Sequence, residues 1–163
     1  MSLGRDIKKT KPFDSLEQEA MLNLARTCDV LAGEMVARVF KPAGLSPAQY
    51  NVLRILRGAG EHLACGEIAD RMIARDPDMT RLLDRLEKRK LVSRCRQQDD
   101  RRVVAVRITD AGLKLLAELD PRVLGAHREQ LSHMTESELK QLIALLEKAR
   151  TRETNSDTTK AKP

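Results

Sequence analysis

One stretch of sequence decides the fold of this chain: MTRLLDRLEKRKLVSRCRQQDDRRVVAVRITDAG, Met79–Gly112. Its first ten residues place methionine and leucine side chains three and four positions apart, which predicts an amphipathic helix. Apolar and polar residues then alternate over residues 92–96 and again over 104–108, with the polar run 97–100 in between. This change of period predicts that the helix is followed by a β-hairpin with a charged tip.

Two shorter helices are expected upstream of this stretch. The segment Ser46–Gln49 supplies an N-cap serine, a proline at the first helical position and a glutamine that completes a capping box. A second helix is expected over Cys65–Ile73. The helix of the decisive stretch is then expected to begin at Asp76, as its N-cap, with Pro77 in the first position.

Longer amphipathic helices flank this central region. The first is expected to start at Ser15, in a capping box with Gln18, and Cys28 lies on its apolar stripe, where we expect it to be buried. Another helix begins after the cap Thr109, and the last opens with the capping box Thr135–Glu138. The apolar stripes of these helices indicate that they need a packing partner.

The positive charge of the chain is concentrated in one window. The formal net charge is +6, and residues 71–107 hold 12 Lys and Arg against 6 Asp and Glu, whereas the other 126 residues hold 18 of each. A localised basic window indicates a polyanionic partner, most often nucleic acid. The three aromatic residues of the chain are too few for modules that stack bases on aromatic platforms.

These features predict a mostly α-helical fold with a small β-hairpin wing, a winged helix-turn-helix. An α-helix fits the major groove of double-stranded DNA, where arginine reads guanine edges, and an arginine on a hairpin reaches the minor groove. The polar face of the helix and the tip of the hairpin therefore provide the candidate DNA contacts. They are Thr80, Arg81, Arg85 and Lys88 on the helix, and Arg101 and Arg102 at the tip.

The same residues resemble the MarR family of bacterial transcription regulators. The likeness is carried by Met79–Gly112, and the flanking Leu45–Tyr50 (LSPAQY) and Gly66–Ala69 (GEIA) are similar to the second and third helices of that family. It covers about residues 15–150. Three motifs together make the resemblance to this family specific: the run of the recognition helix, the D-x-R of the wing and the T-x-x-G after it.

The resemblance implies a recognition helix over Asp76–Lys90 and a wing over Arg94–Arg107. Asp100 and Arg102 fall on the D-x-R pattern, in which the arginine enters the minor groove and the aspartate helps to position the wing. The chain also departs from the family at two helix ends.

Lys90 stands where the family usually has glycine, so it must either accept a left-handed conformation or mark a different cap. Ala64 stands where a serine or threonine usually caps the third helix, which costs about 1 kcal/mol of capping.

An obligate homodimer on a pseudo-palindromic operator is a further implication, with the outer helices of two chains interlocked. The helical dimerisation region then comprises residues 14–44 and 110–150, and the winged helix-turn-helix DNA-binding domain comprises 45–109. Residues 1–13 and 151–163 are polar and are expected to be disordered tails.

By the same resemblance the protein is expected to repress transcription by blocking a promoter until a signal relieves it. Small anionic aromatic or phenolic effectors often bind in the family between the dimerisation helices and the winged domain. The residues closest to that junction lie here in the first, second and fifth predicted helices, and the sequence does not define the pocket.

Plainer interpretations stand beside these. Arg81 and Arg85 could form a solvated helix face paired with Asp78 and Asp84, and Thr80 could serve only as a cap. The two arginines of the wing could be no more than a charged hairpin tip. For the whole chain, the alternative function is a winged helix used for protein–protein contact or for nonspecific DNA packaging.

The three cysteines, Cys28, Cys65 and Cys95, fit neither a disulfide framework nor a metal-ligand pattern, and their use predicts a reducing cytoplasm. Cys65 is the candidate redox residue, because cysteines near helix N-termini are the more reactive ones. His62 and Cys65 form an H-x-x-C, but no second ligand pair follows, so we expect no metal.

Motifs of nucleotide-binding enzymes, hydrolases and zinc proteases are missing, so we expect neither an enzyme nor a cofactor. The longest apolar run is too short for a membrane span.

Overall fold

The computed structural model describes residues 2–96 and 104–151, without the side chain of Arg96. Its internal contacts divide the chain into two units, Met1–Ala126 and His127–Pro163, and each is described by itself. In chain order the elements are α1 (Leu3–Asp6), α2 (Leu16–Met35), the π-helical turn η1 (Val36–Phe40), α3 (Pro47–Ala59), β1 (Leu63–Ala64), α4 (Cys65–Asp70), α5 (Met79–Lys88), β2 (Val92–Arg96), β3 (Val104–Ile108), α6 (Asp110–Gln130) and α7 (Glu136–Arg150).

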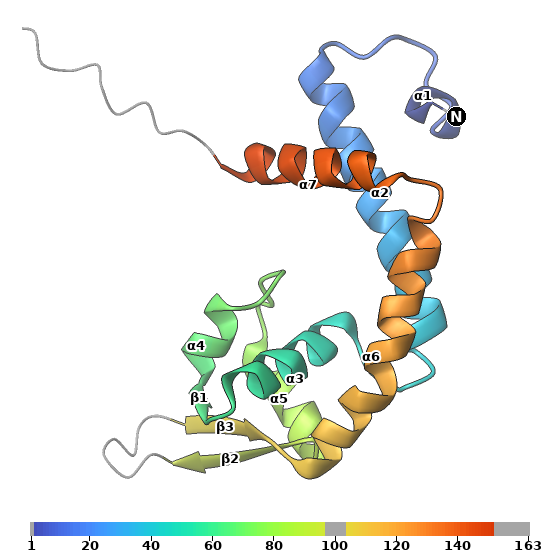
Figure 1. The fold of residues 1–163 in the computed structure, drawn as a ribbon. Coiled ribbons are helices and arrows are strands. Elements are labelled where there is room, and N and C mark those ends of the chain that lie inside the picture. Colours follow the sequence, from blue (N-terminus) through green and yellow to red (C-terminus); the bar gives the residue numbers. More distant parts are fainter. Residues whose placement is uncertain (1, 97–103, 152–163) are drawn as a thin grey trace, which may run out of the picture. The chain divides into compact units, whose positions relative to one another are not determined.

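The winged helix-turn-helix lies in the first unit, where α3, α4 and α5 lie on one side of a three-stranded antiparallel sheet in the order β1-β3-β2 (Figure 1). β2 pairs with β3, and Val92 lies opposite Ile108, which confirms the two predicted strands of the hairpin. β1 joins the other edge of β3, with Leu63 opposite Val106. The sequence did not predict this third strand, because two residues are too few to show an alternating pattern.

α3 begins where the sequence predicts. The Ser46 Oγ atom accepts a hydrogen bond from the Gln49 N–H at 3.2 Å, and the Gln49 Oε1 atom accepts one from the Ser46 N–H at 2.9 Å, so the capping box is complete. Gly60 ends the helix in the left-handed conformation, with φ of 71°. Fully buried leucines and a valine fix the inner face of α3: Val52, Leu53 and Leu56.

Two other helix starts lack part of a capping box. Ala64 has no side-chain acceptor, and only the Glu67 carboxylate remains, which accepts a hydrogen bond from the Ala64 N–H at 2.8 Å. At α2, the Ser15 Oγ atom accepts from the Gln18 N–H at 3.2 Å, as predicted. The Gln18 Oε1 atom, however, accepts from the N–H of Asp14 at 3.0 Å and not from that of Ser15.

α4 is shorter than predicted and ends at Asp70, not at Ile73. The N–H groups of Arg71 and Met72 bond to carbonyls three residues back, at 3.2 Å each, and these tighter turns close the helix. Ile73 consequently lies beyond the helix and is 84% exposed.

α5 begins at Met79, and its N-cap is Asp78, so the prediction of Asp76 as N-cap is wrong by two residues. The Asp78 carboxylate accepts a hydrogen bond from the Arg81 N–H at 3.1 Å. The Asp76 carboxylate instead accepts one from the N–H of Asp78 at 2.9 Å. This local turn contains Pro77 and competes with an earlier start of the helix.

The T-x-x-G pattern joins α6 to the end of α5. The Thr109 Oγ atom donates to the Lys90 carbonyl at 2.7 Å and accepts from the Gly112 N–H at 3.2 Å, so Thr109 caps α6 as predicted. Lys90 accepts the left-handed conformation, with φ of 58°. A Cβ atom at Gly112 would lie 2.4 Å from the Leu91 carbonyl oxygen, so this contact requires glycine.

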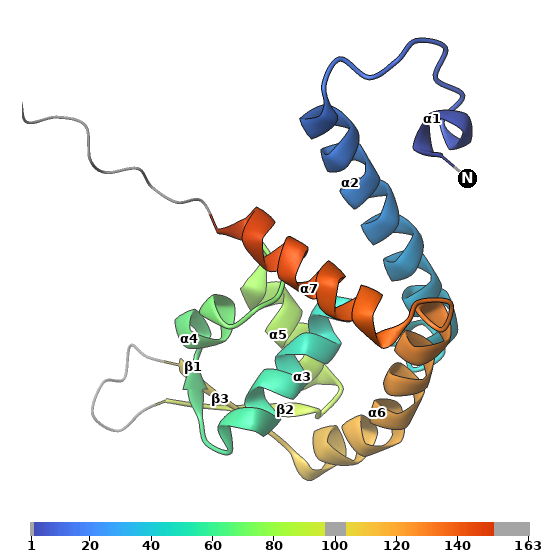
Figure 2. The same cartoon turned by 45° about the horizontal axis from the view of Figure 1, so that its top comes forward.

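One hydrophobic core runs through the first unit. It joins the leucines of α3 and α5 to residues of η1 and α6, among them Val39, Phe40, Leu116 and Leu119. Figure 2 shows that α2 is one long helix continuing into η1. Met35 is the single buried residue of α2, and Cys28 is exposed, so the prediction of a buried Cys28 is wrong for this single chain. Only the C-terminal end of the helix reaches the core.

The two terminal segments contain one helix each. Residues 2–13, expected to be a disordered tail, contain the four-residue helix α1, in which Leu3 is buried. In the second unit, α7 begins with the complete capping box predicted at Thr135 and Glu138. None of the side chains of α7 is buried. The remaining predicted tail, apart from Thr151, lies outside the described residues.

Candidate nucleic-acid interface

α5 is anchored by one face and exposes the other. Its inner face consists of three buried leucines: Leu82, Leu83 and Leu86. On the outer face, Thr80, Arg81, Arg85 and Lys88 are all exposed. The structure thus brings the four helical candidates for DNA contact together on one surface of the helix.

The cations of this face differ in their partners. The Arg81 Nε atom lies 3.3 Å from the Asp78 carboxylate, and the Arg81 side chain remains 71% exposed. Arg85 and Lys88 have no hydrogen-bond or ion-pair partner among the described residues. Thr80 is not the cap of the helix, since Asp78 is.

Both carboxylates of α5 face Arg94 of β2. The Arg94 Nη1 atom lies 2.7 Å from Asp84 Oδ1, and its Nε atom lies 3.6 Å from Glu87 Oε2. The Nη2 group donates to the Thr80 carbonyl at 3.2 Å. The plainer of the two sequence interpretations paired Asp84 with arginines of its own helix, and neither found Arg94, because no signal in the sequence gives the orientation of a strand against a helix.

The wing tip lies outside the described residues, which stop at 96 and resume at 104. Asp100, Arg101 and Arg102 belong to this interval, so their roles stay predictions. The strands β2 and β3 on either side of the interval are paired along their whole length.

The cysteines do not form a common site. Cys65 is the first residue of α4 and is partly buried against the core, whereas Cys28 and Cys95 are exposed. No group of three or more His, Cys, Asp or Glu within the described ranges is placed to hold a metal ion. The redox role of Cys65 stays a prediction.

A polar cluster that the sequence did not predict connects α3 to α6. The Arg57 guanidinium lies 2.5 Å from Asp120 Oδ2, and the Tyr50 hydroxyl donates to Asp120 Oδ1 at 3.3 Å. Hydrogen bonding to Arg57 lowers the pKa of Asp120, and burial together with the Asp120 charge raises the pKa of Tyr50. The partners are 63 and 70 residues apart, so spacing along the sequence gives no signal for them.

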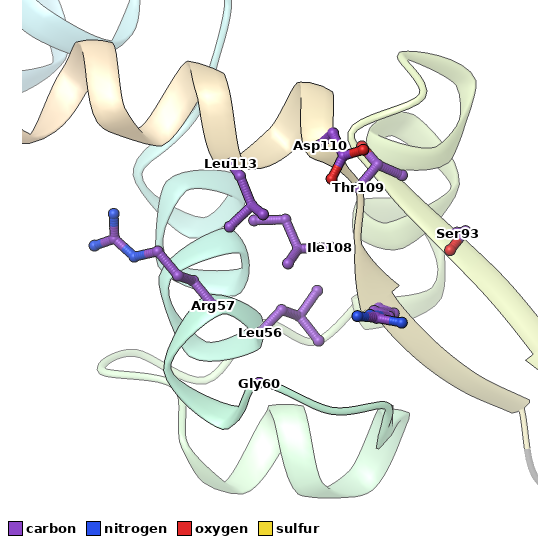
Figure 3. A pocket seen from close by; sticks show the side chains of 9 residues that line it. Leu56, Arg57, Gly60, Ser93, Ile108, Thr109, Asp110 and Leu113 are labelled. Carbon is purple, nitrogen blue, oxygen red and sulfur yellow. The ribbon is translucent and has the colours of Figure 1, made fainter.

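The first unit also contains a pocket of about 450 Å³ at the root of the hairpin. Leu56, Ile108 and Leu113 form its apolar part between α3 and α6, and Thr109 and Asp110 lie at one end (Figure 3). Ser93 and Arg107, from facing positions of β2 and β3, add polar groups to its lining. Apolar side chains and polar groups therefore share the lining of this pocket.

Comparison with known proteins identifies the family of this arrangement. A sequence profile described as the MarR family matches residues 43–103. The HTH-type transcriptional repressor MdtR of Bacillus subtilis is 33% identical over 131 residues, which make up 80% of this chain and 83% of that protein. The chain belongs to the MarR family.

Solved structures agree with the MarR family assignment. The crystal structure of a MarR transcription factor from Planctomyces limnophilus is 48% identical, with 83% of this chain and 98% of that chain covered and a TM-score of 0.65. BpsR of Bordetella bronchiseptica, at 22% identity and a TM-score of 0.73, covers 82% of this chain and 99% of its own, and shows the same fold.

The MarR family consists of helix-turn-helix transcription regulators, so this protein is a DNA-binding regulator and not an enzyme. No helix among the described residues is both long enough and apolar enough to span a membrane.

Proposed function

We propose that this MarR family protein is a repressor that binds a pseudo-palindromic operator as a homodimer and is released by a small anionic aromatic or phenolic effector. The cationic outer face of α5 is the observation that carries the proposal. Arg81, Arg85 and Lys88 are exposed on a helix whose opposite face is fixed in the core. A helix anchored in this way presents its polar face to the major groove of DNA. The name of MdtR, a repressor, supports the direction of regulation.

The wing supplies the second DNA contact in this proposal. Arg102, on the D-x-R pattern, enters the minor groove, where a narrow groove concentrates negative potential, and Arg101 contacts the adjacent backbone. Asp100 positions the wing. The pairing of β2 with β3 gives the segment that carries these residues a fixed base.

The exposed apolar side chains of the long helices support the homodimer. On α2, Leu16 is 81% exposed and Met21 is 65% exposed, and on α7, Leu145 is 65% exposed. Apolar surface of this kind on a soluble protein is usually covered by a partner. In the proposal, residues 14–44 and 110–150 of two chains cover one another, while 45–109 of each chain binds one half-site.

The effector part of the proposal rests on the pocket at the root of the hairpin and on the fold shared with BpsR. The structure of BpsR is described as explaining regulation of its DNA binding by 6-hydroxynicotinic acid, a hydroxylated aromatic acid. A ligand of that class in the pocket would contact α3, β3 and α6 together, because all three line it. Binding there could therefore shift the hairpin relative to α6.

Selection of DNA tests the proposal directly. The full-length protein is used to enrich duplexes from a random-sequence pool, and the enriched sequence is then footprinted. We expect a pseudo-palindrome with half-sites about one helical turn apart, and we expect Arg102→Ala to weaken binding and shorten the footprint while circular dichroism stays unchanged. Enrichment of no sequence, with strongly salt-dependent binding, would instead identify a nonspecific DNA-packaging protein.

A further inference from the structure

The charge arrangement on α5 poses a problem for a DNA-binding helix. Its ten residues contain two carboxylates, Asp84 and Glu87, next to the three cations of the outer face. Asp84 is three residues from Arg81 and four from Lys88, which are the spacings at which oppositely charged side chains of a helix pair. Pairing of that kind would neutralise the cations before DNA arrives, and free carboxylates would repel phosphates.

Arg94 binds both carboxylates and so keeps them from pairing with the cations of α5 and from repelling phosphates. Its guanidinium binds Asp84 at 2.7 Å and approaches Glu87 at 3.6 Å, while Arg81 turns to Asp78 outside the helix. The Arg94 side chain is only 22% exposed, and its Nε atom is buried without a hydrogen-bond partner. A partly buried guanidinium whose Nε atom lacks a hydrogen bond is costly, so its attraction to two carboxylates is what stabilises it in this position.

The same side chain spans two turns of the helix. Its third contact, the hydrogen bond to the Thr80 carbonyl at 3.2 Å, lies one turn before Asp84. β2 is thereby attached to α5 at positions 80, 84 and 87 through one residue.

We propose that Arg94 is a positioning residue for DNA binding, which sequesters the two carboxylates of the recognition helix, keeps Asp84 from pairing with Arg81 and Lys88, and keeps both carboxylates from facing phosphates. This inference rests on the proposed role of α5 as the recognition helix. It predicts that loss of Arg94 harms DNA binding chiefly by releasing Asp84 and Glu87, and not by loosening the fold.

The test removes the arginine and the acids separately, with the duplex selected by the wild-type protein as probe. We expect Arg94→Gln to weaken binding about tenfold, because freed carboxylates occupy the cations and face phosphates. The salt dependence should also become shallower, by about one phosphate contact. Adding Asp84→Asn and Glu87→Gln to Arg94→Gln should restore the affinity to within about threefold of wild type.

Two controls separate this effect from others. Arg89→Gln removes a comparable arginine, one that donates to the Gly44 carbonyl at 2.5 Å and holds no carboxylate, and should leave the affinity nearly unchanged. Arg94→Gln combined with Glu61→Gln and Glu118→Gln has the same net charge as the triple variant above, but its acids are removed elsewhere in the first unit. We expect it to bind DNA as weakly as Arg94→Gln alone. Thermal unfolding of each variant monitors the fold.

Three outcomes would overturn the inference. The triple variant could bind as weakly as Arg94→Gln, which would make Arg94 a brace only. Arg94→Gln could bind like wild type. If Arg94→Gln does not fold, the double variant Asp84→Asn, Glu87→Gln replaces it in the test. The inference requires that this double variant bind DNA at least as tightly as wild type, so weaker binding would overturn it. Failure of the proposed function looks different, because Arg81→Ala and Arg85→Ala would then have no effect either.

Discussion

Lys90 follows Arg89, the C-cap of α5, and is held in the left-handed conformation, with φ of 58°. This conformation costs a residue with a Cβ atom about 1–2 kcal/mol, a cost that glycine avoids. Glycine, however, loses more backbone entropy on folding, which offsets part of the stabilisation. We therefore expect Lys90→Gly to raise the free energy of unfolding by about 0.5–1 kcal/mol in urea denaturation. Arg85→Gly, in the interior of α5, should lower it, because glycine is unfavourable there. A loss of stability in Lys90→Gly would show that the lysine side chain has a stabilising contact.

Arg81 is the exposed cation closest to the N-terminus of α5, the part of a recognition helix that contacts base edges. We expect Arg81→Ala to relax specificity at one operator position by about 1–3 kcal/mol, the contribution of a bidentate contact to guanine. The measurement is binding to operator duplexes varied one base pair at a time. Lys114→Ala on α6, which also removes an exposed cation, should leave the preferences unchanged. A uniform loss across all duplexes would mean that Arg81 contacts phosphate only.

At the scale of elements, α3 and α6 are connected by Arg57 and Asp120. Hydrogen bonding lowers the pKa of Asp120 in the folded state, so its stabilisation is present above the unfolded pKa of about 4 and is lost as pH falls through the folded value. We expect Asp120→Asn to cost about 0.5–1 kcal/mol at pH 7, a modest amount because the pair is partly exposed. The difference from wild type should shrink as pH falls below about 4, because the Asp120 carboxylate then becomes protonated. Urea denaturation at pH 7 and at acidic pH measures it.

Asp29→Asn is the matched control for that pair, since Asp29 meets Arg26 at 3.5 Å within one exposed helix. It should change the stability little at either pH. A difference between Asp120→Asn and wild type that persists unchanged at low pH would show that the packing of the carboxyl group, and not its charge, connects the two helices.

The elements also show which parts of this protein could be predicted from its sequence. Capping at Ser46 and Thr135 depends on residues three positions away, so a linear pattern contains all the information. β1 exists only because Leu63 pairs with a strand far along the chain, and no local pattern records that. The face of α5 was predictable from its period, whereas the partner of its carboxylates, Arg94, depends on how β2 packs and was not.

At the scale of the whole molecule, the apolar surface of the long helices argues for two chains. All side chains of α7 are at least partly exposed, and Ile143 is 56% exposed, although apolar residues recur along the helix. We expect sedimentation at micromolar concentration to give twice the chain mass of 18.3 kDa. Ile143→Asp should produce monomers, because it puts a charge into the proposed interface, and should weaken operator binding by separating the half-sites. Ile73→Asp changes an equally apolar residue in the turn after α4, 84% exposed, and should leave the dimer intact. A wild-type protein that sediments as a stable monomer would leave the exposed faces of α2 and α7 to another partner.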